Sequence, residues 1–299
     1  MSLSDLTPVV PQPIEQVFSD IKNASSEPSK KNRELIRKVL QALQKTQKYS
    51  AYAFLAFFGL HISSVVVAPA LGVSAEKSQD FFEMSRAVYM NPLFEYPITY
   101  AAAGVHVACG VFARVVRSLF SPAKKLSRKE RDIVIHDQHR DDIGLGGIGT
   151  ILGLGYKKSW ISSKMPALTP LTFSGYVMAG ALAYHFYRMK YGAVVVDGDS
   201  ALVTLNFVTH YLHQSFYGRL GALFNYAMLG LLSWVSFYHT ISGLFKYRRQ
   251  FSLRARKIAY TVIGVFSGLS FIAMTRFRSW DLETGFVGKQ FAKYLFVRD

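Results

Sequence analysis

The stretch FSGYVMAGALAYHF, from Phe173 to Phe186, is apolar until it reaches a histidine. An earlier stretch, YSAYAFLAFFGLHI from Tyr49 to Ile62, has the same form: an aromatic residue, serine, a small residue, tyrosine, eight further residues and then histidine. A pattern that occurs twice in one chain indicates an internal repeat. The chain is therefore predicted to contain duplicated units.

The repeat continues in a second segment of each unit. LFEY (Leu93–Tyr96) corresponds to LFNY (Leu223–Tyr226), and HVACGVF (His106–Phe112) corresponds to HTISGLF (His239–Phe245). Both of the longer segments read His-x3-Gly-x-Phe. The sequence thus predicts a unit of two membrane helices, each carrying one histidine, and predicts that this unit occurs twice.

The composition places these units in a membrane. The 299 residues are 50% hydrophobic and 14% aromatic, with a mean hydropathy of +0.17. A helix needs about 20 apolar residues to cross roughly 30 Å of hydrocarbon. Five runs approach that length, at 49–71, 94–113, 170–191, 221–245 and 258–275. The shorter, glycine-rich run Ile143–Gly155 is expected to be a re-entrant piece or a packed loop, not a crossing.

The predicted fold is an all-α integral membrane protein, a five-helix bundle made from two repeated two-helix units. In the tail, apolar residues at helical spacing predict a juxtamembrane helix on the surface, and the C-terminal segment FVGKQFAKYLF is amphipathic enough to lie at the membrane interface. The predicted segments are the N-terminal tail 1–48, the first membrane repeat 49–120, a basic linker 121–169, the second repeat with the fifth helix 170–277, and the C-terminal tail 278–299.

Charge predicts the orientation. The formal net charge of +16 comes from Lys and Arg in the tail, after the second apolar run and after the fourth, whereas the other two loops are acidic. Because Lys and Arg prefer the cytosolic side, the N-terminus and all basic loops are expected there. Contact with anionic lipid explains these loops better than nucleic-acid binding does. The start of the sequence shows neither a secretory signal nor a matrix presequence, so delivery is expected to rest on the spans.

The repeated histidines are the first candidate site. An imidazole inside a membrane is costly and is also a common haem ligand. From the helical rise, His106 and His239 lie roughly 10–12 Å from the cytosolic ends of their helices, and His61 and His185 roughly 18–21 Å. Equal depth pairs His106 with His239 as axial ligands of a haem b, with His61 and His185 near the ring edge. The alternative is hydrogen bonding to a neighbouring helix.

The remaining histidines, the glycine-rich segment and the cysteine do not predict a further site. His136, His139, His210 and His213 are expected in loops outside the repeat, and the cluster HDQHRDD (His136–Asp142) fits a solvated loop better than a metal site. The segment GLGGIG lacks the strand and the acidic residue of a dinucleotide fingerprint. The single Cys109 allows no disulfide within the chain. No enzymatic activity is predicted.

Two family resemblances follow from these motifs. The two-helix unit, with LTPLTFSGYVMAGALAYHFYR and His-x3-Gly, resembles the membrane anchors of succinate dehydrogenase, in which second-helix histidines ligate haem; only His106 and His239 match, and no quinone site carries over. The five runs, the duplicated unit, the basic loops and the tail together are similar to the Mdm-ten-complementing protein family of the fungal mitochondrial outer membrane.

The second resemblance implies a function. It implies a mitochondrial outer-membrane adaptor, N-terminus in the cytosol, that recruits a vacuolar-protein-sorting-thirteen bridge-like lipid-transfer protein. The tail carries a matching Pro-x-Pro segment, LTPVVPQP, whose partner-binding residues would be Leu6, Val9, Pro11 and Pro13. Prolines favour an extended chain, which lowers the cost of ordering on binding. The alternative is a disordered proline-bearing tail.

Three classes of function remain open from the sequence. The first is the adaptor, whose body anchors the partner and, because lipid delivered to one leaflet must be equilibrated, is a candidate to scramble phospholipids. The second is a haem b membrane cytochrome or redox anchor, for which no flavin, iron–sulfur or nucleotide motif supplies a redox partner. The third is a small-molecule transporter, for which no pair of broken helices appears in corresponding positions.

Overall fold

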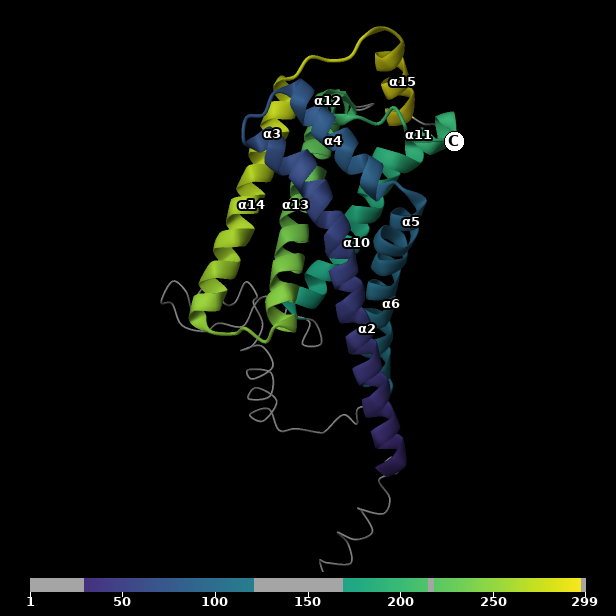
Figure 1. Cartoon of the computed structure of the whole chain (residues 1–299), viewed down its shortest axis with the longest axis vertical. Coiled ribbons are helices and arrows are strands. Elements are labelled where there is room, and N and C mark those ends of the chain that lie inside the picture. The colour runs from purple at the N-terminus through teal and green to yellow at the C-terminus, as the bar shows by residue number, and fades with distance from the viewer. Residues whose placement is uncertain (1–29, 121–168, 215–217, 297–299) are drawn as a thin grey trace, which may run out of the picture.

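The computed structural model describes residues 30–120, 169–214 and 218–296, and every regular element in these ranges is a helix (Figure 1). The predicted all-α class is therefore confirmed for this part of the chain. The elements in chain order are α2 (Lys30–Ile62), η2 (Ser63–Val67), α3 (Ala68–Ala70), α4 (Ala75–Tyr89), α5 (Pro92–Phe94), η3 (Glu95–Ala101), α6 (Ala102–Phe120), α10 (Pro170–Phe186), η4 (Tyr187–Tyr191), α11 (Gly192–Asp197), α12 (Leu205–His213), α13 (Gly218–Tyr247), α14 (Leu253–Ser279) and α15 (Gly285–Leu295).

Four stretches of the described chain are long and apolar enough to cross a membrane: Lys31–Ala70, Pro92–Phe120, Gly218–Tyr247 and Leu253–Ser279. They overlap four of the five predicted runs. The fifth run, 170–191, is helical as α10 and η4, but its second half, AYHFYRMKY, mixes tyrosines with ionisable residues and lowers its hydropathy. The helical part of the prediction holds there, and a crossing at α10 stays a prediction.

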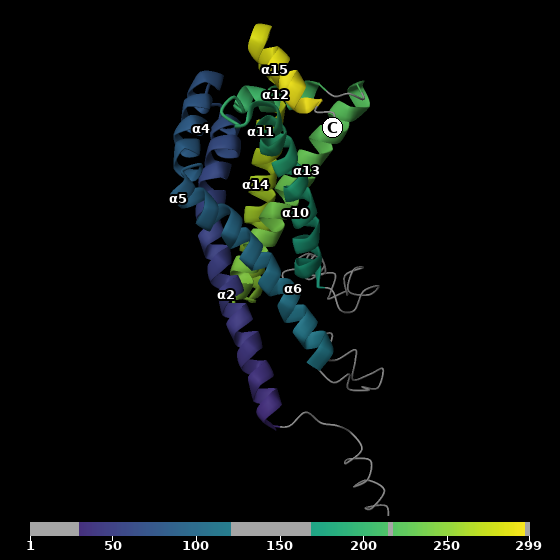
Figure 2. The same cartoon turned by 90° about the vertical axis from the view of Figure 1, so that its right-hand side faces the viewer.

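The long helices form two antiparallel pairs and one added helix. α2 packs along α6, α10 packs along α13, and α14 packs along α13. Figure 2 shows α2 and α4 on one side of the molecule, α10 and α13 on the other, and α6 crossing between them. Each pair joins a first and a second helix of one predicted unit.

The first helix of each pair contains a π turn at the same place. η2 begins at Ser63, two residues after His61, and η4 begins at Tyr187, two residues after His185; each is five residues long. A π turn accommodates one extra residue in a helix and is often found at functional sites. Two helices that matched in sequence thus also match in this local irregularity.

Two segments predicted as loops are helices. The acidic segment after the first run forms α4, which begins at Ser74, where the serine side chain accepts a hydrogen bond from the Lys77 amide. The segment after 170–191 forms α11 and α12, and α12 contains His210 and His213. The prediction of loops was wrong because both segments are far shorter than a membrane crossing, and short helices of this kind depend on tertiary packing for their stability.

The best-packed core lies at the end of the molecule formed by α4, α12 and α15 (Figure 1). Leu205, Phe207 and Tyr211 of α12 are 0–1% exposed, and Phe277 of α14 and Phe291 of α15 close over them. α15 is the amphipathic C-terminal helix that the sequence predicts. By contrast, the mid-length surface of α6 and α14 exposes apolar side chains, as a membrane-facing surface does.

α2 continues past the bundle at the opposite end. It runs for 33 residues without a break, so the predicted surface helix of the tail is the first part of the same helix that carries His61. Figure 1 shows this part projecting beyond the ends of α13 and α14. Leu35 and Val39 are exposed on it, which leaves an uncovered stalk leading to the N-terminal tail.

Candidate functional site

The structure brings His106 of α6 and His239 of α13 together between the two helix pairs. Their ring centroids are 6.2 Å apart and their planes are perpendicular. These residues come from different units, 133 positions apart in the sequence. The rings are therefore a point of contact between the two copies of the predicted repeat.

Each of these rings is held by a backbone carbonyl of its own unit. Nδ1 of His106 lies 3.0 Å from the Gln47 carbonyl oxygen, and Nδ1 of His239 lies 3.2 Å from the Leu171 carbonyl oxygen. Gln47 and Leu171 occupy equivalent places, fourteen residues before the histidine of their own helix. The same hydrogen bond is thus made twice.

A serine supports each of these carbonyls. Ser50 Oγ donates to the Gln47 carbonyl at 3.0 Å, and Ser174 Oγ donates to the Leu171 carbonyl at 2.8 Å. Ser174 Oγ also lies 3.2 Å from Nδ1 of His239. These are the serines of the repeated sequence pattern. Their role could not be predicted from the sequence, because a backbone acceptor leaves no mark there.

His61 and His185 meet in a second contact, with ring centroids 6.1 Å apart. His61 stacks on Phe57 and lies edge-on to Tyr89 of α4. Nδ1 of His61 and Nδ1 of His185 have no hydrogen-bond partner among the described residues. Burial raises the pKa of Tyr89, so its hydroxyl stays protonated. This pair is packed by rings, whereas His106 and His239 are oriented by hydrogen bonds.

Two glycines give the rings and their supports room. A Cβ added to Gly175 would lie 2.9 Å from Cε1 of His239, so the ring needs the missing side chain. A Cβ on Gly110, the glycine of the first His-x3-Gly, would lie 2.7 Å from Nε2 of Gln47. At Gly243, the glycine of the second His-x3-Gly, nothing lies within 4 Å. The motif glycine thus has a packing role in one unit only.

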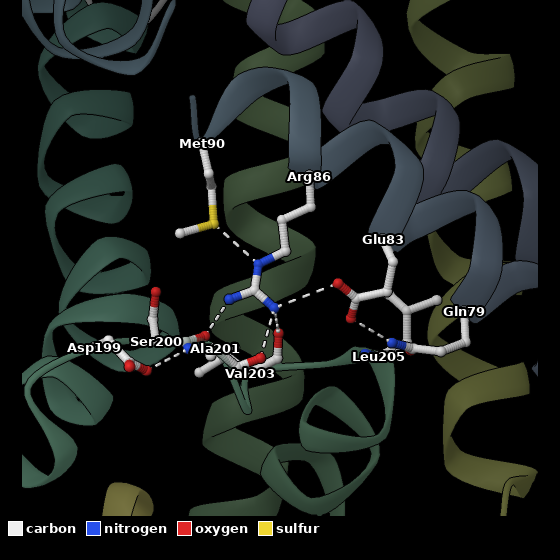
Figure 3. A network of polar contacts seen from close by, with 9 residues as sticks. All are labelled: Gln79, Glu83, Arg86, Met90, Asp199, Ser200, Ala201, Val203 and Leu205. Carbon is white, nitrogen blue, oxygen red and sulfur yellow. Dashed lines mark hydrogen bonds and ion pairs between the residues drawn. The ribbon is translucent and has the colours of Figure 1, made fainter. Parts of the chain in front are cut away.

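Arg86 joins the two units outside the candidate spans, and no sequence pattern predicts this role (Figure 3). Its buried guanidinium donates to the carbonyls of Ser200, Ala201 and Val203, in the turn between α11 and α12. The Glu83 carboxylate lies 3.7 Å away on α4. Because the planar guanidinium carries several donors in a fixed arrangement, one side chain fixes this turn against α4.

A second charged link lies where the two units meet. Lys190 of η4 forms an ion pair with Glu95 of η3, and the Tyr100 hydroxyl donates to the same carboxylate at 2.7 Å. All three residues belong to the predicted membrane runs. Asn225, another polar residue at membrane depth, donates to the Tyr211 carbonyl at 2.8 Å and is buried, so its role is to hold α12 on α13.

The other predicted residues lie outside the described ranges. They are the tail residues Leu6, Val9, Pro11 and Pro13, the loop histidines His136 and His139, and the run Ile143–Gly155. Their predicted roles, and the predicted domain boundaries, stay predictions. Among the described residues no group of three or more His, Cys, Asp or Glu is arranged to hold a metal ion.

Comparison with known proteins finds similarity to the MDM10-complementing protein 1 family. Residues 56–161 match the model of the MDM10-complementing protein 1 transmembrane domain. The chain is 29% identical over 229 residues to the mitochondrial adapter protein MCP1 of Saccharomyces cerevisiae, an alignment that covers 75% of this chain and 70% of the relative. The predicted resemblance to the Mdm-ten-complementing family is confirmed. No solved structure matches the chain. The resemblance to succinate dehydrogenase anchors therefore stays a prediction.

Proposed function

On the similarity to the MDM10-complementing protein 1 family, we propose that the chain is an adaptor of the mitochondrial outer membrane that recruits a vacuolar-protein-sorting-thirteen bridge-like lipid-transfer protein. The observation that carries the proposal is that the relative aligned over most of the chain is itself a mitochondrial adapter protein. The described residues add a body with four candidate membrane helices.

The shape of the molecule suits an adaptor. α2 extends beyond the other helices, with Lys and Arg on its projecting part, and the tail 1–29 precedes it (Figure 1). Basic residues next to a span favour the cytosolic side. A short ligand in that tail would be presented away from the membrane, where a large soluble partner can reach it.

The ligand is proposed to be Leu6, Val9, Pro11 and Pro13. Prolines at alternate positions favour an extended backbone, so the segment loses less entropy when it adds to a groove or to a sheet edge. Leu6 and Val9 would fill side-chain pockets of such a site. The partner would thus be recognised by backbone shape together with two apolar anchors.

Co-purification from mitochondria tests this proposal. The full chain carrying Pro11→Ala and Pro13→Ala should lose the lipid-transfer partner by tenfold or more, about the loss of 1.4 kcal/mol of binding free energy. Pro28→Ala, in the same tail, is the matched control and should retain the partner. Retention by the double variant, or equal loss with Pro28→Ala, would contradict the proposed ligand.

The body is proposed to be a five-helix bundle containing two copies of the two-helix unit. Support comes from the equivalent π turns and from the equivalent carbonyl and serine contacts at His106 and His239. Single cysteines tested in a Cys109→Ser background give the topology. Gln250→Cys should react with an impermeant reagent on intact mitochondria, and Glu76→Cys only after the outer membrane is opened. The reverse result would overturn the proposed orientation.

Lipid scrambling is proposed as a second activity of this body. Its support is the set of polar groups at the meeting of the units, above all the Glu95–Lys190 ion pair and the two histidine pairs. Such groups lower the cost of moving a headgroup across hydrocarbon. Liposomes containing the purified chain should lose leaflet asymmetry of a fluorescent phospholipid faster than empty liposomes, and Lys190→Met should slow the exchange. An exchange rate equal to that of empty liposomes would remove the idea.

A further inference from the structure

We propose that the tail segment 14–21 folds back onto the projecting part of α2 and covers apolar residues that α2 exposes there. In this docked form the neighbouring Pro-x-Pro segment is masked. The docking itself follows from the exposed face of α2 and from the sequence of the tail. The masking rests on the proposed function, because it concerns the proposed ligand.

The projecting part of α2 has two apolar faces, and only one of them is partly buried. α2 packs along α6, and Ile36 and Leu40 are partly buried. On the adjacent face, Leu35 and Val39 are 61% and 40% exposed, and Ala42 is exposed as well. Spacings of four and three residues place these last three side chains in one stripe along the helix.

Lipid does not account for the exposure of this stripe. The carbonyl of Gln47 contacts the His106 ring, so the two residues lie at the same depth, roughly 10–12 Å from the cytosolic end of the span. Val39 and Leu35 precede Gln47 by eight and twelve residues, or roughly 12 and 18 Å along the helix axis. Val39 therefore lies near the membrane surface and Leu35 beyond it, where an uncovered apolar face contacts water.

The sequence of the tail contains a complementary segment, outside the described residues. Its apolar residues recur at helical spacing, which predicts a short amphipathic helix. They are Ile14, Val17, Phe18 and Ile21. The charged residues of this segment, Glu15 and Asp20, are both acidic. The segment thus combines an apolar face with negative charge.

The charges of α2 are of the opposite sign. Lys31, Lys38 and Lys45 follow one another at intervals of seven residues, beside the apolar stripe, and all three are exposed. Lys38 also pairs with Glu34 of its own helix at 2.9 Å. Exposed ion pairs stabilise little, so the apolar contacts hold the segment and the charges set its orientation.

The two segments match in register as an antiparallel hairpin. Both helices rise by the same amount per residue, so contacting positions are symmetric about the turn. The symmetric pairs about position 28 are Ile21 with Leu35, Val17 with Val39, and Ile14 with Ala42. Position 28 is a proline in the serine-containing stretch 22–29, whose composition is typical of a turn. Its eight residues are within the usual length of a connection between packed helices.

The covalent connection favours the tail over other occupants of the stripe. A tethered segment has an effective concentration in the millimolar range, so a contact with few apolar anchors is sufficient. A second copy of α2 would instead bring one row of lysines against another. The acidic tail segment is therefore the occupant that agrees with both the charge and the register.

Docking changes the position of the proposed ligand. Ile14 is brought to Ala42, and Pro11 and Pro13, which directly precede Ile14, are held near the membrane surface. A large soluble partner cannot enclose a segment that lies there. The released tail presents the ligand, so the apparent affinity for the partner is reduced by the fraction of chains that are docked.

Disulfide cross-linking of the full chain tests the docking. In a Cys109→Ser background, Ile14→Cys is combined with Ala42→Cys or, as a matched control, with Gln41→Cys, an exposed neighbour on another face. The chain is purified in detergent and oxidised with copper phenanthroline, and mass spectrometry of tryptic peptides measures the linked fraction. Because successive helix residues point in different directions, we expect at least about fivefold more linkage with Ala42→Cys.

Val39→Asp is the disrupting variant. It places a negative charge in the stripe against an acidic segment, so linkage between Ile14→Cys and Ala42→Cys should fall to the level of the control pair. Gln44→Asp adds the same charge at an exposed position on another face and should leave the linkage unchanged. Equal linkage in the two cysteine pairs, linkage between two chains, or linkage that survives Val39→Asp would overturn the docking.

Co-purification of the lipid-transfer partner tests the masking separately. Val39→Asp in the chain with its native tail should capture about threefold more partner than the wild type, because more of the tail is released. Gln44→Asp should capture as much as the wild type. Equal capture by Val39→Asp and the wild type would overturn the masking. If no chain captures the partner, the proposed function fails, whereas the cross-linking still decides the docking.

Discussion

The two helix pairs agree where they face each other and differ at the end of the molecule that carries α15. In both pairs a second-helix histidine donates to the carbonyl fourteen residues before the first-helix histidine. At the end of the molecule that carries α15, Met84 and Val88 of α4 are exposed in the first pair. In the second pair, Phe207 and Leu212 of α12 are fully buried. The two pairs are thus alike at their contact and in their π turns, and they differ in how far their connecting helices are buried.

The difference has a simple structural cause. α14 and α15 follow the second pair in the chain and pack on α12, whereas the first pair is followed by the basic linker. The added helices enclose α12 in the core. α4 contributes Phe82 to the same core but keeps its opposite face exposed.

The largest expected loss of stability follows a substitution in α12, the more deeply buried of the two connecting helices. Phe207 is 0% exposed and contacts Phe291 and Tyr294, so Phe207→Ala should lower the free energy of unfolding by about 3–5 kcal/mol. Met84→Ala, on the exposed face of α4, should change it by less than about 0.5 kcal/mol. Denaturation in detergent measures both. A loss of similar size for Met84→Ala would mean that α4 is covered as well.

Substitution of Arg86 should have the next largest effect, because this side chain connects α4 to the turn before α12. Arg86→Met leaves the carbonyls of Ser200, Ala201 and Val203 without their donor, at an expected cost of about 3 kcal/mol in unfolding free energy. Arg86→Lys should recover only part of it, since a single ammonium cannot reproduce the planar guanidinium fork. If Arg86→Met leaves the unfolding free energy unchanged, the turn is stable without this side chain.

Two glycines of α10 test how tightly the His239 ring is packed. Gly175→Ala places a Cβ 2.9 Å from Cε1 of His239 and should destabilise the protein by about 1–2 kcal/mol. Gly180→Ala, one helical turn and a half further along α10, meets nothing within 4 Å and should stabilise the helix by up to about 1 kcal/mol. Thermal denaturation of the two variants gives the order. The reverse order would mean that the His239 ring moves freely.

The smallest expected effect is on pH dependence. Burial against α15 lowers the pKa of His210, so the unfolded chain takes up a proton below about pH 6.5 while the folded chain does not. Stability should therefore fall as the pH drops below this value. His210→Gln should make this decline shallower, and His213→Gln, on the same helix, should not. The free energy of unfolding measured at pH 7.5 and at pH 5.5 tests this expectation. An equal decline for the wild type and His210→Gln would contradict it.

Sequence reasoning reached the long helices because a membrane imposes length and apolarity on them, and it reached the histidines because such residues stand out there. It missed α4 and α12, which are too short to stand out as membrane crossings and are stabilised by packing against other elements. It also missed Gln47, Leu171 and Arg86. The first two act through backbone carbonyls, and the partners of Arg86 lie more than a hundred residues away.

The π turns after His61 and His185 have a consequence for the history of the chain. Each places one surplus residue at the same distance from its histidine. If the units are copies, a single insertion before the duplication accounts for both turns. η3 has no counterpart in α13, so this irregularity was gained in one copy or lost from the other after the copying. A relative with only one unit should then carry the histidine-linked π turn, which makes this irregularity a marker of descent as well as of structure.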